Sequence, residues 1–265
     1  MKTPENIEFS HYKKLPKSIK FLATQTAVWD FMFKNNLKTH AQLKEHIRHE
    51  FKESDVILKS VEYNFWRRKL NGEVISKSNG FKLFPIVMNK SAKLLNHPFW
   101  TLLATRKFDA PTIDALMKRL PYIVRRIIRS SGNKTKSYPL KQSYVPQKQR
   151  LYEEESLDSL AALLLITITE IKRYKKGRCN QAEQLAFNQF FQIFTHQYPI
   201  KSRDDLAIEI DKLLCRVTNE FHIPFIDYQN EDGVAEAKSI DPIYFGTLYS
   251  KNIAHGMFKI VENTT

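Results

Sequence analysis

The sequence predicts a mainly α-helical protein with small β-hairpins, and three observations support this fold class. Apolar residues recur at helical spacing through much of the chain. Capping residues precede several of these stretches, and the 265 residues include only seven glycines. One Asn-Gly pair, Asn79-Gly80, lies between two short stretches that predict strands, and this pair is a strong local signal for a hairpin.

The first group of elements covers residues 20–90. Three helices are predicted in turn, over residues 24–36, 38–51 and 53–70, and Thr39 is the expected cap of the second. Their apolar sides are formed by Val28, Phe31 and Met32, by Leu43, Ile47 and Phe51, and by Ile57, Val61 and Phe65. Residues 71–87 then predict two strands joined by the Asn79-Gly80 turn.

The second group covers residues 91–150 and repeats this order more loosely. Helices are predicted over 96–108, 110–120 and 122–131, with Asn96 and Thr112 as caps of the first two. In the third helix, the spacing predicts a buried stripe of Ile123, Val124, Ile127 and Ile128. The opposite face carries Tyr122, Arg125, Arg126 and Arg129. Residues 134–149 are expected to form either a basic hairpin or a linker.

Three helices followed by a hairpin is the element order of winged helix-turn-helix DNA-binding proteins, and residues 20–145 resemble two such units in tandem. The resemblance implies that each third helix enters the major groove and that each hairpin, the wing, follows the adjacent backbone. Arginine, asparagine, serine, tyrosine and lysine are the residue types that contact bases and phosphates. The expected DNA contacts are Lys59, Ser60, Tyr63, Asn64, Arg67, Arg68, Lys77, Lys82, Tyr122, Arg125, Arg126, Arg129, Lys134 and Lys136.

The charge of the chain is unevenly distributed along the sequence. Of the net +14, residues 1–150 contribute +19 and residues 151–265 contribute −5. Such an uneven distribution of charge indicates a basic binding part joined to a near-neutral or acidic part. Because the cations are spread over several predicted elements and not along one amphipathic helix, nucleic acid is favoured as the partner over an anionic membrane.

Four regions are predicted: an N-terminal arm over 1–19, a first winged-helix unit over 20–90, a second over 91–150 with its basic linker, and a mostly helical domain over 151–265. No apolar stretch reaches the roughly 20 residues of a membrane span. The N-terminus lacks the apolar core of a secretory signal, and the two cysteines have no metal-ligand spacing. These features predict a cytoplasmic protein that makes no membrane contact.

The leading hypothesis is a sequence-specific double-stranded DNA-binding protein without cofactor or metal, most simply a bacterial transcriptional regulator that forms a homodimer through its C-terminal helical domain. The alternative is a replication initiator of a plasmid, phage or other mobile element, because such initiators also resemble paired winged helices. Either protein would bind duplex DNA and would not be an enzyme.

Two further hypotheses come from smaller patterns. Asp227, Glu236 and Lys238 resemble the carboxylate hairpin of restriction-endonuclease-like nucleases, although an exposed hairpin with an ion pair explains them more simply. Base stacking on tryptophans would indicate an RNA- or single-strand-binding protein, but Trp29, Trp66 and Trp100 are expected in the core. The histidines of residues 40–49 lack the partners of a metal site and are expected at the surface.

Overall fold

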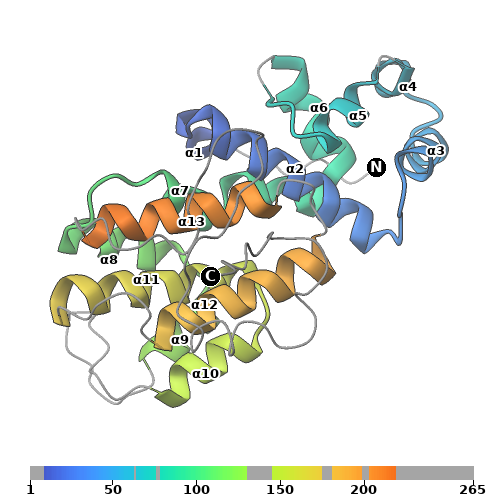
Figure 1. The fold of residues 1–265 in the computed structure, drawn as a ribbon. Helices are drawn as coiled ribbons and strands as arrows, with labels where there is room; N and C mark the ends of the chain where they lie inside the picture. The colour runs from blue at the N-terminus through green and yellow to red at the C-terminus, as the bar shows by residue number, and fades with distance from the viewer. Residues whose placement is uncertain are drawn as a thin grey trace, which may run out of the picture. The chain divides into compact units, whose positions relative to one another are not determined.

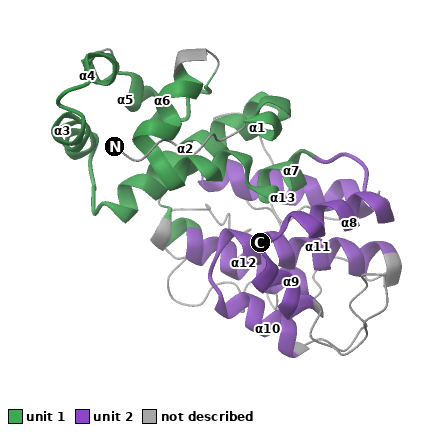
Figure 2. Cartoon of the chain, turned by 180° about the vertical axis from the view of Figure 1, so that it is seen from behind, with its two compact units in different colours: residues 1–104, 194–202 green, residues 105–193, 203–265 purple. Residues whose placement is uncertain are grey.

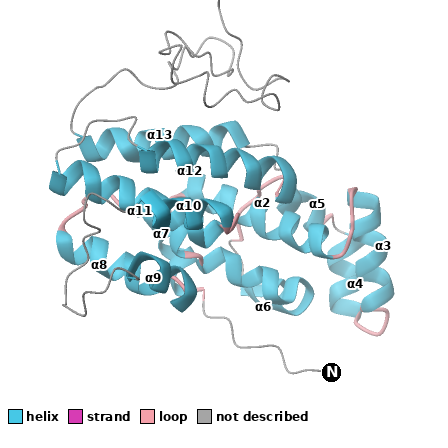
Figure 3. Ribbon diagram, turned by 90° about the horizontal axis from the view of Figure 1, so that it is seen from below, coloured by secondary structure: helices cyan, strands magenta, loops and turns pink. Residues whose placement is uncertain are grey.

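The computed structural model describes residues 9–62, 64–75, 78–129, 145–174, 181–198 and 203–218 of the chain. These residues form helices joined by short loops, and no β-strand occurs among them (Figure 1 and Figure 3). The mainly α-helical fold class is therefore confirmed. The chain divides into two compact units, one of residues 1–104 and 194–202, the other of residues 105–193 and 203–265 (Figure 2).

Unit 1 is built around one long helix. Its elements are α1 (Ser10–Lys14), α2 (Lys17–Lys34), α3 (His40–Glu50), α4 (Asp55–Glu62), α5 (Phe65–Leu70), α6 (Ser78–Met88), the 3₁₀ helix η1 (Asn89–Asn96) and α7 (Pro98–Ala104). Helix α2 packs against α5, α6, η1 and α7, and most of its side chains are buried. Helix α2 starts earlier than predicted, directly after Pro16, whose fixed φ suits the entry to a helix.

The start of α3 follows the sequence prediction closely. The side chain of Thr39 accepts a hydrogen bond from the backbone N–H of Gln42, and the Gln42 side chain accepts one from the N–H of Thr39. This reciprocal pair is a capping box, which satisfies two amide groups that the first turn leaves open. Leu43 and Ile47 are buried as predicted, and α3 ends at Glu50.

The predicted third helix over residues 53–70 is wrong as a single element, because it consists of two shorter helices. Asn64, between α4 and α5, has a left-handed backbone conformation with φ of 54°. A residue in this conformation cannot continue a right-handed helix, and asparagine tolerates it better than most residues do. Lys59 and Arg67 therefore belong to different helices and not to the single helix that the sequence predicted.

The predicted hairpin wing over residues 71–87 is also not found, because residues 78–88 form helix α6. Leu83, Phe84, Val87 and Met88 are buried at helical spacing. Gly80 serves a packing role and not a turn: a Cβ atom placed there would lie 2.9 Å from Cγ2 of Ile75. The Asn79-Gly80 pair thus fits a close approach of two segments, which sequence patterns cannot distinguish from a turn.

Unit 2 is also helical. Its elements are α8 (Ala110–Arg119), α9 (Tyr122–Arg129), α10 (Val145–Glu153), α11 (Leu157–Tyr174), α12 (Gln181–Gln192) and α13 (Arg203–Thr218). A π-helical turn, η2 (Ile193–Gln197), follows α12 at the division between the units. Helix α11 is buried almost all round and packs against α8, α9, α10, α12 and α13. It is the centre of unit 2, as α2 is of unit 1.

Residues 145–149, the last part of the predicted basic hairpin or linker, belong to helix α10, and residues 134–144 of that prediction lie outside the described residues. Lys148 of α10 forms an ion pair with Glu170 of α11, with Nζ and Oε1 separated by 2.6 Å, and only 3% of each side chain is exposed. The side-chain amide of Gln189 in α12 donates hydrogen bonds to the carbonyls of Leu151 and Tyr152, at 2.8 and 2.9 Å. These contacts fix α10 inside unit 2.

Candidate nucleic-acid interface

Two segments of unit 1 contain no acidic residue at all. Residues 9–29 cover α1 and the first part of α2, and residues 74–104 cover α6, η1 and α7. The two segments pack on one another, since α1 and α2 both contact η1 and α2 also contacts α6 and α7. The fold therefore combines two stretches of purely positive charge that lie some 50 residues apart in the sequence.

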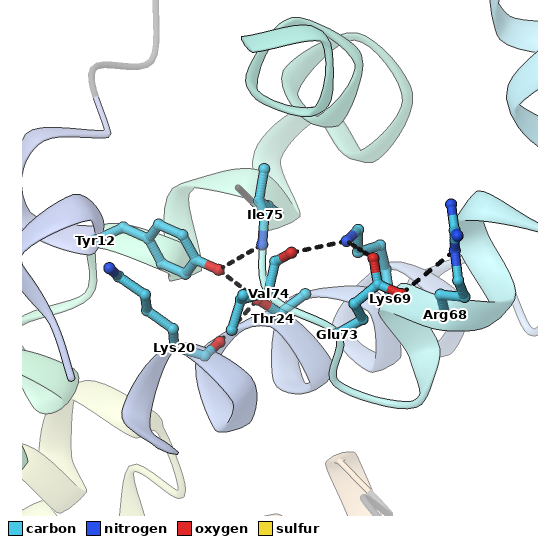
Figure 4. Close-up of polar contacts among 8 residues, drawn as sticks. All are labelled: Tyr12, Lys20, Thr24, Arg68, Lys69, Glu73, Val74 and Ile75. Carbon is cyan, nitrogen blue, oxygen red and sulfur yellow. Dashed lines mark hydrogen bonds and ion pairs between the residues drawn. The ribbon is translucent and has the colours of Figure 1, made fainter. Parts of the chain in front are cut away.

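Helix α1 has only five residues, and its place depends on one buried tyrosine. The hydroxyl of Tyr12 accepts a hydrogen bond from the backbone N–H of Ile75 at 3.0 Å and lies 2.7 Å from Oγ1 of Thr24 (Figure 4). Thr24 gives its own proton to the carbonyl of Lys20, so the Tyr12 hydroxyl donates to Thr24. Burial raises the pKa of Tyr12, so this proton is retained.

A second set of contacts joins α1 to α6 and η1. The backbone N–H of Tyr12 donates to Oδ1 of Asn96, at the end of η1, at 3.1 Å. The ring of Phe81 in α6 lies 5.2 Å from the ring of Phe9 and 6.0 Å from that of Tyr12. Nζ of Lys13 lies 5.1 Å from the centre of the Phe81 ring, which is the geometry of a cation–π contact. Lys13 is thereby held close to the part of α6 that carries Lys82.

The anchored elements expose several lysine side chains. The lysine surface, as we name it, consists of Lys13, Lys14, Lys17, Lys82, Lys90 and Lys93, all of which are exposed. Within the described residues, Lys14, Lys17, Lys82 and Lys90 make no ion pair. Like charges that lack neighbouring carboxylates repel one another, and a polyanion relieves that repulsion when it binds. Of these six residues, the sequence had indicated only Lys82.

Helices α3 and α4 are joined by four residues and pack on one another, which matches the connection length of a helix-turn-helix pair. The charge of α4 does not match that of a recognition helix, however. Its exposed positions include Asp55 and Glu62 beside Lys59, and Val56 is 67% exposed. A helix that presents two carboxylates and one lysine has no net attraction for phosphate.

Ser60 of α4 was expected to contact DNA, but it is directed into unit 1. Only 7% of Ser60 is exposed, and its hydroxyl donates to the carbonyl of Ile57 and accepts from Nε1 of Trp66 at 2.9 Å. The structure therefore removes Ser60 from the expected contacts. Trp66 is fully buried, and its ring lies 5.7 Å from that of Phe84, so this tryptophan belongs to the core.

Helix α5 carries two exposed arginines and one buried lysine. Arg67 is exposed, and Arg68 forms an exposed ion pair with Glu73, with Nε and Oε2 3.3 Å apart (Figure 4). Lys69 is buried and donates to Oε1 of Glu73 at 3.0 Å and to the carbonyl of Val74 at 2.8 Å. Burial lowers the pKa of Lys69 and Glu73 opposes that shift. Arg67 and Arg68 thus remain candidates for nucleic-acid contact, together with the exposed Asn64 before them.

The positive charges of Lys44 and Arg67 both act on His40 in unit 1. His40 and Lys44 are one helical turn apart on α3, and Arg67 comes from α5, which packs on α3. Burial lowers the pKa of His40, and the positive charges of Arg67 and Lys44 lower it further. No carboxylate contributes to the pKa shift of His40.

Helix α9 of unit 2 differs from its predicted arrangement. Val124, Ile127 and Ile128 are buried, but Ile123 is 65% exposed and lies beside Tyr122, which is 67% exposed. The prediction that Ile123 is buried is wrong, because α9 packs on α10 and α11 through a narrower face. Neither α8 nor α9 has the other as a main packing partner, so the two do not resemble a helix-turn-helix pair.

The arginines of α9 are not equivalent. Arg126 is exposed, whereas Arg125 is half-buried and its Nε atom lies inside the protein without a hydrogen-bond partner among the described residues. Arg129 ends the helix. Tyr63, Lys77, Lys134 and Lys136 lie outside the described residues, as do the side chain of Arg129 and the Asp227, Glu236 and Lys238 pattern.

The sequence prediction missed most of the lysine surface because it placed the DNA contacts on the third helix and the hairpin of each group. The signal was present in the sequence as the absence of Asp and Glu from residues 9–29 and 74–104. Whether two such segments meet depends on contacts such as those of Tyr12 with Ile75 and Asn96, which no local pattern reveals.

Comparisons of the chain with protein-family models, with curated proteins and with solved structures gave no match. None of the helices that the structure describes is both long and apolar enough to span a membrane. The same residues contain no group of three or more His, Cys, Asp and Glu side chains arranged to hold a metal ion.

Proposed function

We propose that the protein binds double-stranded DNA and that the lysine surface of unit 1 contacts the phosphate backbone. The observation that carries this proposal is that two acid-free segments pack on one another and that each of Lys13, Lys14, Lys17, Lys82, Lys90 and Lys93 on them is exposed. Lysine contributes a mobile point charge suited to phosphate, and each such contact releases condensed counterions from the duplex.

Sequence selectivity, in this proposal, comes from other side chains. Lysines at phosphates fix position and carry little sequence information, whereas arginine and asparagine pair with base edges in two-point contacts. Arg67 and Asn64 of unit 1 and Arg126 of unit 2 are exposed and have the required chemistry. The function that follows is that of a DNA-binding regulator of transcription, and the replication initiator is the alternative with the same chemistry.

The experiment is selection of a random duplex library by the purified full-length protein at roughly 150 mM salt, where non-specific binding is weakened. A recovered motif supports sequence-specific binding, and its genomic setting separates the two roles: single promoter sites indicate regulation, and repeated arrays indicate initiation. Retained binding without a motif would show a backbone-only binder. Absence of duplex binding at low salt would overturn the proposal.

A further inference from the structure

Helix α5 ends in a turn that brings Glu73 back beside Arg68 and Lys69. The backbone N–H of Glu73 donates to the carbonyl of Arg68 at 2.9 Å, and the N–H of Gly72 donates to the carbonyl of Lys69 at 2.9 Å. These two hydrogen bonds form a Schellman motif, which needs a residue in the left-handed conformation, and Gly72 supplies it with φ of 87°. The backbone therefore fixes the place from which the Glu73 side chain extends.

The carboxylate of Glu73 is held by a lysine that the fold buries. Nζ of Lys69 lies 3.0 Å from Oε1 of Glu73 and 2.8 Å from the carbonyl oxygen of Val74, and only 3% of the Lys69 side chain is exposed (Figure 4). The same Nζ lies 5.1 Å from the centre of the Phe65 ring. A buried charge is costly unless it is paired and hydrogen-bonded, so Lys69 keeps the Glu73 carboxylate in place.

One peptide group ties this turn to helix α1. The carbonyl of Val74 accepts the hydrogen bond from Lys69. The N–H of Ile75, at the other end of the same peptide bond, donates to the hydroxyl of Tyr12 at 3.0 Å (Figure 4). The hydrogen bonds that place Glu73 are thus continuous with those that place α1.

Glu73 in turn contacts Arg68 along one edge of the guanidinium. Nε of Arg68 lies 3.3 Å from Oε2 of Glu73, and 54% of the Arg68 side chain is exposed (Figure 4). A guanidinium is planar, and its N–H donors have a fixed arrangement. Because the Nε edge is directed at Glu73, the two terminal nitrogens of Arg68 are left for a two-point contact with a ligand.

A carboxylate beside an arginine favours one kind of DNA contact over another. The negative charge of Glu73 repels phosphate and so reduces the attraction of Arg68 for the DNA backbone. It leaves intact a two-point hydrogen bond to the uncharged edge of guanine, where N7 and O6 both accept. The lysine surface differs in this respect, since four of its lysines make no ion pair within the described residues.

We propose that Arg68 contacts the major-groove edge of a guanine and that Glu73 is the residue that positions Arg68 for this contact. The inference rests on the proposed DNA binding and adds to it the side chain that distinguishes one G·C pair of the target. An exposed ion pair such as that of Arg68 and Glu73 contributes little to stability, so the role of the carboxylate is to orient the arginine.

The test measures the affinity of the full-length protein for the duplex motif that library selection recovers, for single-base variants of that motif, and for an unrelated duplex of equal length. Arg68→Lys keeps the charge and loses the two-point geometry. We expect this variant to lose about tenfold of the preference for one G·C pair and to keep its affinity for the unrelated duplex. Arg48→Lys, at an exposed arginine of α3, is the control and should keep every base preference.

Glu73→Gln tests the positioning role. It should lower the preference at the same G·C pair and raise the affinity for the unrelated duplex, because it removes a negative charge. A purely structural role would lower both affinities together. Glu62→Gln, which removes an exposed carboxylate of α4, is the control and should leave the preference unchanged. Thermal unfolding checks the fold of each variant, and Arg68→Lys tests the base contact without disturbing the buried Lys69.

The outcomes separate this inference from the proposed function. If wild type selects a motif and Arg68→Lys keeps every base preference, the guanine contact is wrong and the proposed DNA binding stands. If Arg68→Lys loses the preference and Glu73→Gln keeps it, the positioning role of Glu73 is wrong. Duplex binding without any motif overturns the inference and leaves the phosphate contacts in place. Absence of duplex binding at low salt overturns both.

Discussion

The two units use positive charge in different ways. Unit 1 contains 19 Lys and Arg against 9 Asp and Glu, and six of its lysines are exposed in two segments, residues 9–29 and 74–104, that contain no acid. Unit 2 contains 23 Lys and Arg against 19 Asp and Glu. There, Lys148 is buried in an ion pair with Glu170, and Arg125 is half-buried. Exposed Lys107 and Lys118 of unit 2 are paired with Asp109 and Asp114.

The contrast shows that a basic stretch of sequence is not by itself a binding surface. Residues 105–150 carry a net +10, yet they fold in one unit with segments of opposite net charge. Part of their charge is neutralised inside that unit. Residues 9–29 and 74–104 contain no acids, and within the described residues their Lys14, Lys17, Lys82 and Lys90 make no ion pair. Substitutions in the two units test this difference and the packing of the helices that carry the charges, and we expect them to differ widely in their effects.

Lys148→Met should have the largest effect, because it removes Lys148 from its buried ion pair with Glu170. Removing one partner of a buried ion pair destabilises a protein by about 3–5 kcal/mol. Urea unfolding followed by circular dichroism measures the loss, and the added change Glu170→Leu should recover most of it. A loss of stability below about 1 kcal/mol would show that the ion pair of Lys148 contributes little to the stability of the fold.

Ile127→Ala and Ile123→Ala form a matched pair on α9 that tests which face is buried. Ile127 is buried, and its truncation should cost about 2–4 kcal/mol. Ile123 is 65% exposed, and its truncation should change stability by less than about 0.5 kcal/mol. Equal losses of stability in thermal unfolding would show that Ile123 is buried too, as the sequence predicted.

Arg67→Ala with Arg68→Ala should weaken duplex binding about tenfold and leave stability nearly unchanged, because both side chains are exposed. The comparison variant is Arg126→Ala in unit 2, with an expected effect of a few-fold. Anisotropy titrations of one duplex at fixed salt measure both. A larger loss of DNA affinity in Arg126→Ala would show that the main DNA contact lies in unit 2 and not in unit 1.

Among the substitutions expected to lower stability, Thr39→Ala should have the smallest effect, about 1 kcal/mol, because it removes the capping box of α3. Thr39→Ser keeps the accepting oxygen and serves as the control. Hydrogen exchange at the amide of Gln42 should accelerate in the alanine variant only. Unchanged protection there would show that the cap does not hold the start of α3.

The sequence predicted the helical class, the Thr39 cap and most buried positions, because these follow from local periodicity and hydrogen bonding. It failed at Gly80 and at the break before α5. At Gly80 the reason for a glycine is the nearby side chain of Ile75, five residues away in sequence but fixed by tertiary packing. At Asn64 a single left-handed residue divided a stretch whose apolar pattern was continuous.

The candidate site was harder to predict than the fold for the same reason. Arg67, Arg68, Lys82 and Arg126 are exposed as predicted, whereas Ser60 is buried. Predicting the lysine surface would have required knowing that Tyr12 holds α1 against Ile75 and Asn96. Residue type and spacing indicate which side chains bind phosphate, but the tertiary fold decides which of them face solvent together.

Binding of duplex phosphates by the lysine surface should be visible in the salt dependence of DNA affinity. The measurement is the slope of log affinity against log salt between roughly 50 and 200 mM for three proteins. They are wild type, Lys82→Gln with Lys90→Gln, and the control Lys107→Gln with Lys118→Gln, whose lysines are exposed but already paired. We expect the Lys82 and Lys90 variant to flatten the slope by about 1.8 and the control to leave it unchanged. Equal slopes for all three proteins would contradict phosphate binding by the lysine surface.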